Sequence, residues 1–407
     1  MIKEPSWSKV RKIEYMHCPS LKELPPPPLD KTGWPWTEES PQLPDNMPDG
    51  TPWPRISIVT PSLGQGKFIE ETIRSVLLQG YPNLEYIIID GGSTDESVNI
   101  IKKYEKWLAY WISEPDKGQA NAINKGVSRA TGDIIAWLNS DDLYEIESLK
   151  KVGTLFASRS DVDIIYGDGI VIDENGAFLE IGESRLINDH DDLGNFIPNR
   201  VFQPSLFFRR KIFDNIGFLD ENLHYALDVD FWIRAFPGHK AFHTGNSLSR
   251  FRLHQSGKTT VSSIKFLQEE LLLISRYGGS HDLFVRYLAA YTAKSSLMNH
   301  VSCESDFEMI LHELRASGVK LDYLEQAIKT RHRLIANAYL LNADIFYNRF
   351  ALYRCRNCLF NACRSFPLIT NKQKFWHLFL ASLLPIPILK YLKKSRGSLL
   401  RGHSFIT

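Results

Sequence analysis

An acidic cluster directly follows an apolar run in this chain. Residues 134–138 read Ile-Ile-Ala-Trp-Leu, and Asn139-Ser140-Asp141-Asp142 come next. An apolar run of this length predicts a buried strand, which places the cluster at the strand's carboxyl end, where open α/β sheets bind ligands. Neighbouring carboxylates repel unless a cation joins them, and hard oxygen ligands suit Mg²⁺ or Mn²⁺. Taken alone, the cluster is explained equally well as a solvated turn that caps the next helix.

Polar residues also end three predicted strands upstream. These strands and their ends are residues 56–59 before Thr60 and Pro61, residues 86–89 before Asp90, and residues 108–112 before a loop with Asp116 and Lys117. Strands that alternate with helices at this spacing predict βαβ units and a parallel sheet. Because parallel strands point the same way, the four polar ends converge on one edge of the sheet. This convergence predicts a ligand site.

Helical patterns fill the intervals between these strands. Apolar residues from Ile69 to Leu77 recur at helical spacing, and residues 119–130 read as another helix. Ser93 followed by Glu96 fits a capping box, which predicts that the intervening helix begins there. The chain has no G-x-x-x-x-G-K-[ST] and no G-x-G-x-x-G after a strand, so a bound diphosphate would need a bridging metal.

In order and spacing, residues from about 54 to 260 resemble a family 2 glycosyltransferase of the GT-A fold. The matching segments are 57–62, 89–95, 113–119, 130–133, 138–142, 225–234 and 252–256. The resemblance implies a Rossmann-like, mostly parallel sheet flanked by helices. It also implies an inverting, metal-dependent transfer of sugar from a nucleotide-diphospho-sugar donor to a saccharide or lipid-linked saccharide acceptor, in bacterial surface polysaccharide assembly.

The resemblance assigns the donor to the strand ends. The implied donor-binding residues are Thr60, Pro61, Asp90, Asp116, Lys117, Asn139, Ser140 and Asp141. Thr60 and Pro61 would line the nucleotide base, and Asp90 would accept a hydrogen bond from it. Residues 139–141 stand where the family has D-x-D, with Asn139 in place of the first Asp.

The implied metal ligands are Asp141, with Asp142 as a further ligand or support, and His254 downstream. A neutral imidazole is a sound Mn²⁺ ligand, although a single His is as often a hydrogen-bonded structural residue. Arg252 and Lys258 lie close by in the sequence and could neutralise the leaving diphosphate.

Asp228 stands at the position of the family's catalytic Asp. A carboxylate there would take the proton of the acceptor hydroxyl as its oxygen attacks the anomeric carbon. Leu227 replaces the Glu of many relatives, and Asp230 follows two residues later. The alternative interpretation is that Asp228 only caps a helix that runs to Ala235. Motif position favours Asp228 over Asp230 as the base.

Two other functions stay open at this point. A nucleotidyltransferase also uses such a sheet and Mg²⁺, but it would need a basic Gly-rich loop after the first strand, where Lys67 is the available cation. A sugar-nucleotide-binding scaffold without turnover is favoured by the departures at Asn139 and Leu227. Gln203, in an aromatic-rich segment, is a further acceptor-side candidate. The chain has no Q-x-x-R-W segment, which disfavours a processive polymerase.

Composition narrows the partners and the compartment. The chain has 48 basic and 47 acidic residues, a net charge of +1, so no broad field favours nucleic acid. No apolar core of a signal peptide and no run of 18 uncharged apolar residues is present. Cys355, Cys358 and Cys363 cluster without a second pair that would complete a zinc site, and they favour packing in a reduced, cytoplasmic protein.

The chain divides into three predicted regions. Residues 1–54 form a Pro-rich extended arm, residues 55–262 the GT-A domain, and residues 263–407 a helical region with a helical hairpin near residues 336–367. Within it, residues from about 375 to 401 are apolar and then basic. This pattern predicts either peripheral contact with the inner face of the plasma membrane or a last helix with a solvated basic tail.

Overall fold

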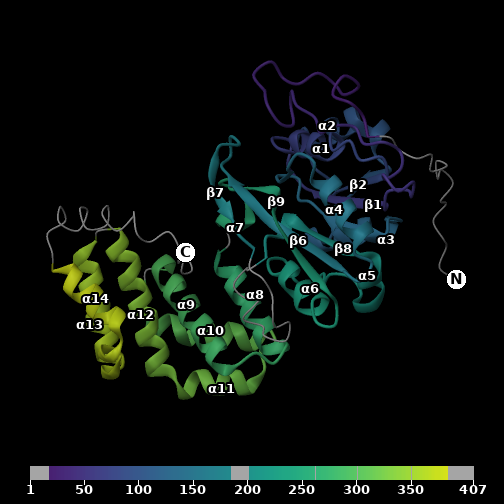
Figure 1. The fold of residues 1–407 in the computed structure, drawn as a ribbon. Coiled ribbons are helices and arrows are strands. Elements are labelled where there is room, and N and C mark those ends of the chain that lie inside the picture. Colours follow the sequence, from purple (N-terminus) through teal and green to yellow (C-terminus); the bar gives the residue numbers. More distant parts are fainter. Residues whose placement is uncertain (1–17, 185–200, 262, 300, 350, 384–407) are drawn as a thin grey trace. The chain divides into compact units, whose positions relative to one another are not determined.

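A computed structural model of the protein describes residues 18–184, 201–261, 263–299, 301–349 and 351–383 (Figure 1). The described residues up to Thr260 form one compact unit, and those from Val261 form a second. The first unit is built around one sheet and the second is helical, as Figure 1 shows.

The sheet of the first unit has nine strands. They are β1 Ile56–Ser62, β2 Leu84–Asp90, β3 Tyr110–Ser113, β4 Ile134–Trp137, β5 Leu143–Tyr144, β6 Ile164–Ile172, β7 Phe178–Gly182, β8 Leu206–Arg209 and β9 Ala241–Arg252. Their order is β3-β2-β1-β4-β8-β6-β9-β5, with β7 paired to β6. The first four are parallel, and β8 runs antiparallel to β4. The predicted α/β fold is therefore confirmed, and antiparallel pairs extend the sheet beyond its parallel half.

Helices cover this sheet and bury their apolar sides. They are α1 Ile69–Leu77, α2 Ser97–Tyr104, α3 Gln119–Arg129, α4 Ser148–Ser158, α5 Arg210–Ile216 and α6 Leu227–Ala235. In α1, Ile69, Ile73 and Val76 are fully buried at positions i, i+4 and i+7, as an amphipathic helix requires. Every residue of β1, β2 and β4 is buried, which explains why these strands are apolar runs rather than alternating patterns.

The capping box predicted at Ser93 is wrong. Helix α2 begins at Ser97, and Asp95 accepts hydrogen bonds from the backbone N and the hydroxyl of Ser97, at 3.1 and 2.6 Å. The Ser93 hydroxyl donates instead to Asp90 at 2.5 Å. The strand end therefore takes the capping hydroxyl, because a buried carboxylate needs donors more than an exposed helix start does.

The described part of the N-terminal arm, residues 18–54, is anchored on the first unit. Trp34 is buried and its indole donates to the Tyr144 carbonyl at 2.8 Å. The fully buried Arg74 of α1 donates to the carbonyls of Pro25, Pro35 and Trp36 at 2.9–3.1 Å. Charge-assisted bonds to three carbonyls satisfy this buried guanidinium, so α1 and the arm hold each other in place.

The second unit consists of packed helices. They are α8 Ser263–Arg276, α9 His281–Asn299, α10 Cys303–Ala316, α11 Leu321–Lys329, α12 Arg331–Asn348, α13 Leu352–Ser365 and α14 Gln373–Ser382, after the short α7 Lys258–Val261. The hairpin predicted near residues 336–367 is present as α12 and α13. Among the described helices, none is long and apolar enough to cross a bilayer. The predicted basic tail after residue 383 lies outside the described residues.

Candidate functional site

The polar ends of the parallel strands meet at one edge of the sheet. Ser62 at the end of β1 is in register with Asp90 at the end of β2, and Asp90 with Ser113 at the end of β3. On the other side of β1, Val59 is in register with Trp137, so the turn from Asn139 onward follows on this same edge. The structure thus brings together the four strand ends on which the predicted ligand site rests.

Asp90 organises the turn after β2. Its carboxylate is fully buried and accepts from the backbone N atoms of Gly92 and Ser93, at 3.1 and 2.8 Å. The hydroxyls of Ser93 and Ser113 donate to it as well, at 2.5 and 2.6 Å. Donors of the chain itself thus surround this carboxylate. Its contact with a nucleotide base stays a prediction, and its role within the structure is to fix the turn.

Asp116 and Lys117 lie in the loop after β3, beside that turn. Asp116 accepts from the Gly118 backbone N at 2.8 Å, and a Cβ at Gly91 would lie 2.6 Å from its carboxylate oxygen. Gly118 has a φ of +117°, which side-chain-bearing residues rarely adopt, and α3 begins directly after it. The Lys117 side chain is exposed. These two glycines therefore allow the Asp116 carboxylate to approach the β2 turn closely.

The end of β1 presents a buried hydroxyl at this edge. Thr60 and Pro61 are buried, and the Thr60 hydroxyl lies 3.1 Å from that of Tyr86. Within the described residues, the Ser62 hydroxyl oxygen is buried without a hydrogen-bond partner. An unpaired buried hydroxyl costs about 1–3 kcal/mol, so a polar ligand atom or a water at this strand end would stabilise it.

Asn139 is held from two sides at the start of the acidic turn. Its carbonyl oxygen accepts from Gln119 of α3 at 2.7 Å, and its amide nitrogen lies 3.2 Å from both Gln203 Oε1 and Asp142 Oδ2. Gln203 also donates to the Trp137 carbonyl at 3.2 Å. Asn rather than Asp suits this position, because one amide can accept from Gln119 and donate to a carboxylate at the same time. Ser140 follows as a buried residue.

Asp142 is an anchor of the acidic turn. It is fully buried and accepts from the Arg252 backbone N at 3.0 Å. Burial raises the pKa of its carboxyl well above the usual range, the Asp141 charge adds to the rise, and the bonds from Arg252 and Asn139 oppose it. The Arg252 guanidinium is itself buried and bound to Glu71 at 2.9 Å and to the Asp141 carbonyl at 3.0 Å. Arg252 therefore braces the turn, and the prediction that Asp142 binds metal stays a prediction.

Asp141 and His254 form the pair that could hold a cation. His254 Nε2 lies 2.9 Å from Asp141 Oδ2, and His254 Nδ1 lies 2.9 Å from the Ser256 hydroxyl. The imidazole packs against the Phe68 ring with centroids 4.6 Å apart. Neighbouring ligands of an octahedral Mg²⁺, each about 2.1 Å from the ion, lie about 3 Å apart. The observed spacing fits that geometry, and the Asp141 side chain keeps 21% of its surface exposed.

Two carboxylates begin α6, and the structure treats them differently. Asp230 is 1% exposed and binds Arg234, one helical turn on, at 2.8 and 3.0 Å. Asp228 is partly exposed, and one of its oxygens accepts from the Val229 backbone N at 2.8 Å. Ionised carboxylates are stabilised at helix starts. Because Arg234 neutralises Asp230, Asp228 is the better placed base, which agrees with the preference from motif position.

Lys258 links the start of α6 to the acidic turn. Its ammonium group donates to Gln119 Oε1 at 2.8 Å and to the His224 carbonyl at 3.1 Å. Gln119 in turn bonds to Asn139. The segment before Asp228, the loop before α3 and the residues after β9 therefore meet through hydrogen bonds, and the predicted catalytic and donor residues belong to one region.

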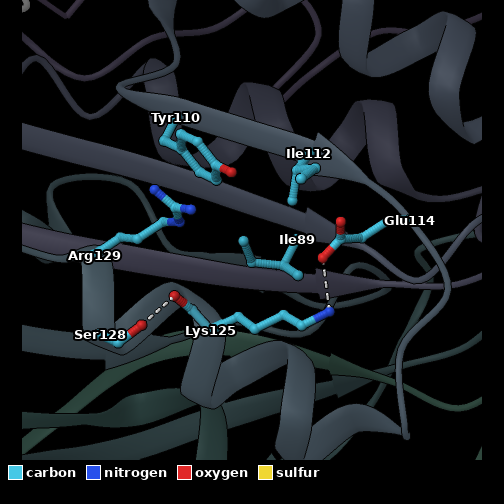
Figure 2. Close-up of a pocket in the computed structure, with 7 residues that line it drawn as sticks. All are labelled: Ile89, Tyr110, Ile112, Glu114, Lys125, Ser128 and Arg129. Atoms are coloured by element: carbon cyan, nitrogen blue, oxygen red, sulfur yellow. Dashed lines mark hydrogen bonds and ion pairs between the residues drawn. The ribbon is translucent and has the colours of Figure 1, made fainter. Parts of the chain in front are cut away.

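A small cavity lies elsewhere on the same unit. It has a volume of about 230 Å³ and lies between α3 and the edge strands β2 and β3 (Figure 2). Lys125 and Glu114 form an ion pair of 2.9 Å across it, and the Arg129 guanidinium lies 4.0 Å from the centre of the Tyr110 ring. It includes none of the predicted site residues, and it is smaller than the 300–1,000 Å³ of typical ligand pockets.

The predicted cysteine cluster is a packing feature of the second unit. Cys355 is fully buried and burial raises its pKa to about 11, while Cys358 and Cys363 are partly exposed. Within the described ranges, no three His, Cys, Asp or Glu side chains are grouped as a preformed metal site. A cation at Asp141 and His254 would therefore take its other ligands from the substrate or from water, as Mg²⁺ often does.

Comparisons with known proteins now identify the family. The profile described as Glycosyl transferase family 2 matches residues 57–217. A PGL/p-HBAD biosynthesis glycosyltransferase of Mycobacterium tuberculosis is 31% identical over 194 residues, which cover 45% of this chain and 70% of that protein. The chain belongs to glycosyltransferase family 2. This family 2 glycosyltransferase has the GT-A fold, as the resemblance predicted.

Further relatives of the family 2 enzyme agree. An uncharacterized glycosyltransferase of Rickettsia prowazekii is 25% identical over 301 residues, 72% of this chain and 91% of the relative. Among solved structures, S. aureus TarS in complex with UDP is similar at a TM-score of 0.46 and 17% identity, covering 72% of this chain and 91% of that one. The mannosyltransferase PcManGT of Pyrobaculum calidifontis, in complex with GDP-Man and Mn²⁺, has a TM-score of 0.44 at 16% identity, covering 75% and 90%.

Sequence reasoning did not find the supports of this site. Gln119 lies within a matched segment, yet its bonds to Asn139 and Lys258 depend on how α3 packs. Glu71 gave no signal as the partner of Arg252, because the two are 181 residues apart. The interpretation of Arg252 as a diphosphate ligand is not supported, since its guanidinium is buried among protein partners.

Proposed function

We propose that this glycosyltransferase moves a sugar from a nucleotide-diphospho-sugar to a hydroxyl acceptor, with inversion at the anomeric carbon and with Mg²⁺ or Mn²⁺ as cofactor. The observation that carries the proposal is the pairing of Asp141 with His254 at the carboxyl end of β4. In the GT-A fold of this family, the donor diphosphate is expected at this edge.

Each residue of the site has a proposed task. Asp141 and His254 would hold the cation, which would neutralise the diphosphate as it leaves. Thr60, Pro61 and Ser62 would border the nucleoside, and the unpaired Ser62 hydroxyl supports a polar contact there. Lys258 lies next to Gln119 and can turn its ammonium group toward a leaving phosphate.

Asp228 would act as the general base. Its carboxylate would accept the proton of the acceptor hydroxyl while that oxygen forms the new bond to the anomeric carbon. The bond from this carbon to the diphosphate oxygen breaks, and the nucleoside diphosphate leaves with the electron pair. One displacement of this kind inverts the anomeric configuration. The partly exposed position of Asp228 at the start of α6 supports this role.

For the acceptor we propose a saccharide or lipid-linked saccharide in the assembly of bacterial surface polysaccharide. The resemblance of the matched segments supports this class, and the mycobacterial relative is named for PGL/p-HBAD biosynthesis. Gln203 binds Asn139 and is a candidate contact on the acceptor side.

A thermal-shift panel of UDP-, GDP- and dTDP-sugars, with and without Mn²⁺, tests the donor site. Ligand at about 100 times its Kd stabilises the folded state by about 2.7 kcal/mol. We expect one nucleotide class to raise Tm only with Mn²⁺, and Asp141→Ala to abolish the rise. Asp161→Ala, at an exposed carboxylate that pairs with Lys240, is the matched control.

The same panel separates the alternatives. Stabilisation by no donor, with folded protein, would contradict the proposal. Donor binding without transfer to any acceptor and without hydrolysis would favour the scaffold function. Transfer that retains the anomeric configuration, measured by NMR of the product, would exclude the single-displacement role of Asp228.

A further inference from the structure

The charge of this chain is distributed unevenly along the sequence. After Asp344 there is no Asp or Glu, yet eleven of the 48 Lys and Arg residues lie there, six of them among the described residues. The near-zero net charge of the whole chain therefore hides a strongly basic end. A basic field of this kind attracts an anionic partner.

Helices α13 and α14, which contact each other at this end of the second unit (Figure 1), also expose large apolar side chains. On α13, Tyr353 and Phe360 are 71% and 70% exposed and lie two helical turns apart. On α14, Trp376, Leu380 and Leu383 are 48%, 59% and 58% exposed at positions i, i+4 and i+7. Such spacing places the side chains of each helix on one side of it.

These side chains are additional to the residues with which the helices pack into their unit. The inward side of α13 buries Cys355, Leu359 and Ala362, and that of α14 buries Phe375 and Leu378. Amphipathic helices of a globular protein normally present polar residues on the opposite side. Here the opposite sides carry aromatic and aliphatic residues, and such surfaces mark interaction sites.

Basic residues accompany these apolar side chains. Arg354 and Arg364 are exposed on α13, close in sequence to Tyr353 and Phe360. Lys372 and Lys374 precede the apolar residues of α14, and Lys374 pairs with Asp344 at 2.9 Å. Arg356 of α13 donates to the Ser382 carbonyl at the end of α14 at 2.7 Å, which ties the two helices together.

We propose that this outer face, made of Tyr353, Phe360, Trp376, Leu380 and Leu383 with Arg354 and Arg364, binds the surface of an anionic lipid bilayer. Trp and Tyr side chains favour the boundary between lipid and water, and Lys and Arg are drawn to anionic headgroups. A nucleic acid would also match the arginines, but it would leave Leu380 and Leu383 in water. No described helix is long enough to span a bilayer, so the binding is interfacial.

Vesicle flotation with the full chain tests this surface. We expect it to float with vesicles of phosphatidylcholine mixed with phosphatidylglycerol, and at least about tenfold less with phosphatidylcholine alone. Trp376→Ser with Leu380→Ser and Leu383→Ser should weaken binding by about tenfold or more. Arg354→Gln with Arg364→Gln, at exposed positions that tolerate substitution, should weaken binding to the mixed vesicles and leave residual binding to neutral ones unchanged.

The matched control is Leu321→Ser with Ile328→Ser on α11, where the two side chains are 62% and 46% exposed in the same unit. It should bind mixed vesicles as the unchanged chain does, with Tm confirming that each variant is folded. No flotation of the unchanged chain, or equal loss in the control, overturns the proposal. Tighter binding of a uridine homopolymer than of mixed vesicles, lost in the arginine variant alone, would assign the face to nucleic acid. Because the readout is lipid binding, it is independent of sugar transfer.

Discussion

The two acidic turns of this glycosyltransferase, residues 139–142 and residues 228–230, divide their carboxylates in the same way. In the first turn Asp142 is fully buried and bonds to the Arg252 backbone, and in the second Asp230 is 1% exposed and bonds to the Arg234 guanidinium. The other carboxylate of each turn, Asp141 or Asp228, retains solvent exposure.

This difference follows from the cost of burying charge. A buried carboxylate is tolerated only with donors or cations beside it, and partners bound that firmly are not released to a substrate. A partly exposed carboxylate can exchange water or a weak partner for a ligand at little cost. We therefore expect substitution of the buried member to affect mainly stability, and substitution of the exposed member to affect mainly chemistry.

The largest effect is expected for Asp228→Asn. The amide cannot accept the proton of the acceptor hydroxyl, so the transfer rate should fall by about 10² to 10⁴. Donor binding and Tm should change little, because the backbone bond from Val229 can still be accepted by the amide oxygen. Initial-rate measurements with a radiolabelled donor, alongside donor titration, separate the two quantities.

The corresponding control is a carboxylate of the same unit with no proposed chemical role. Asp161 is 60% exposed and pairs with Lys240, so Asp161→Asn should retain full activity. If Asp228→Asn kept more than about a tenth of the wild-type rate, a general-base contribution of the usual size would be excluded.

The second effect concerns the cation. Asp141→Asn and His254→Gln should each reduce metal-dependent donor affinity by about tenfold or more, because each removes one of only two proposed protein ligands. Removing the metal with EDTA should do the same to the unchanged protein. Isothermal titration with donor at several Mn²⁺ concentrations measures this. Donor binding that ignores both EDTA and the two substitutions would show that the pair is only a structural hydrogen bond.

The sequence predicted this site to the extent that strand direction determines it. Parallel order alone places Thr60, Asp90, Asp116 and Asp141 on one edge, and the structure has that edge. Partners far away in the sequence decide which carboxylate is buried. Asp142 is an anchor because β9 returns Arg252 to it from 110 residues downstream, and no local pattern specifies that return.

The capping box failed for a related reason. Ser93 and Glu96 have the spacing of a helix start, but the carboxylate of Asp90 competes for the Ser93 hydroxyl. A buried strand end next to a candidate cap is thus a warning in sequence analysis, since the buried group has the greater need of a donor.

The third effect is on stability. Asp230→Asn should lower the free energy of unfolding by about 2 kcal/mol, because it leaves the Arg234 guanidinium without its charge partner in a largely buried place. Urea denaturation of the unchanged and substituted proteins measures it. Any activity lost should return when the variant is assayed at a temperature well below its own Tm. Loss of rate with unchanged stability would instead make Asp230 part of the reaction and break the comparison of the two turns.

The smallest effect is expected where the chain departs from its family's D-x-D. Restoring the acid with Asn139→Asp puts a second carboxylate about where an amide nitrogen now lies 3.2 Å from Asp142. The donated bond becomes a repulsion, so we expect about 1 kcal/mol of lost stability and no gain in donor affinity. Gln203→Leu, which removes the other acceptor of that amide, should leave the Asp142 bond in place and cost less. A more stable Asn139→Asp protein would mean that Asp142 is held protonated, in which case it could donate to the new carboxylate and would no longer serve as a charged anchor.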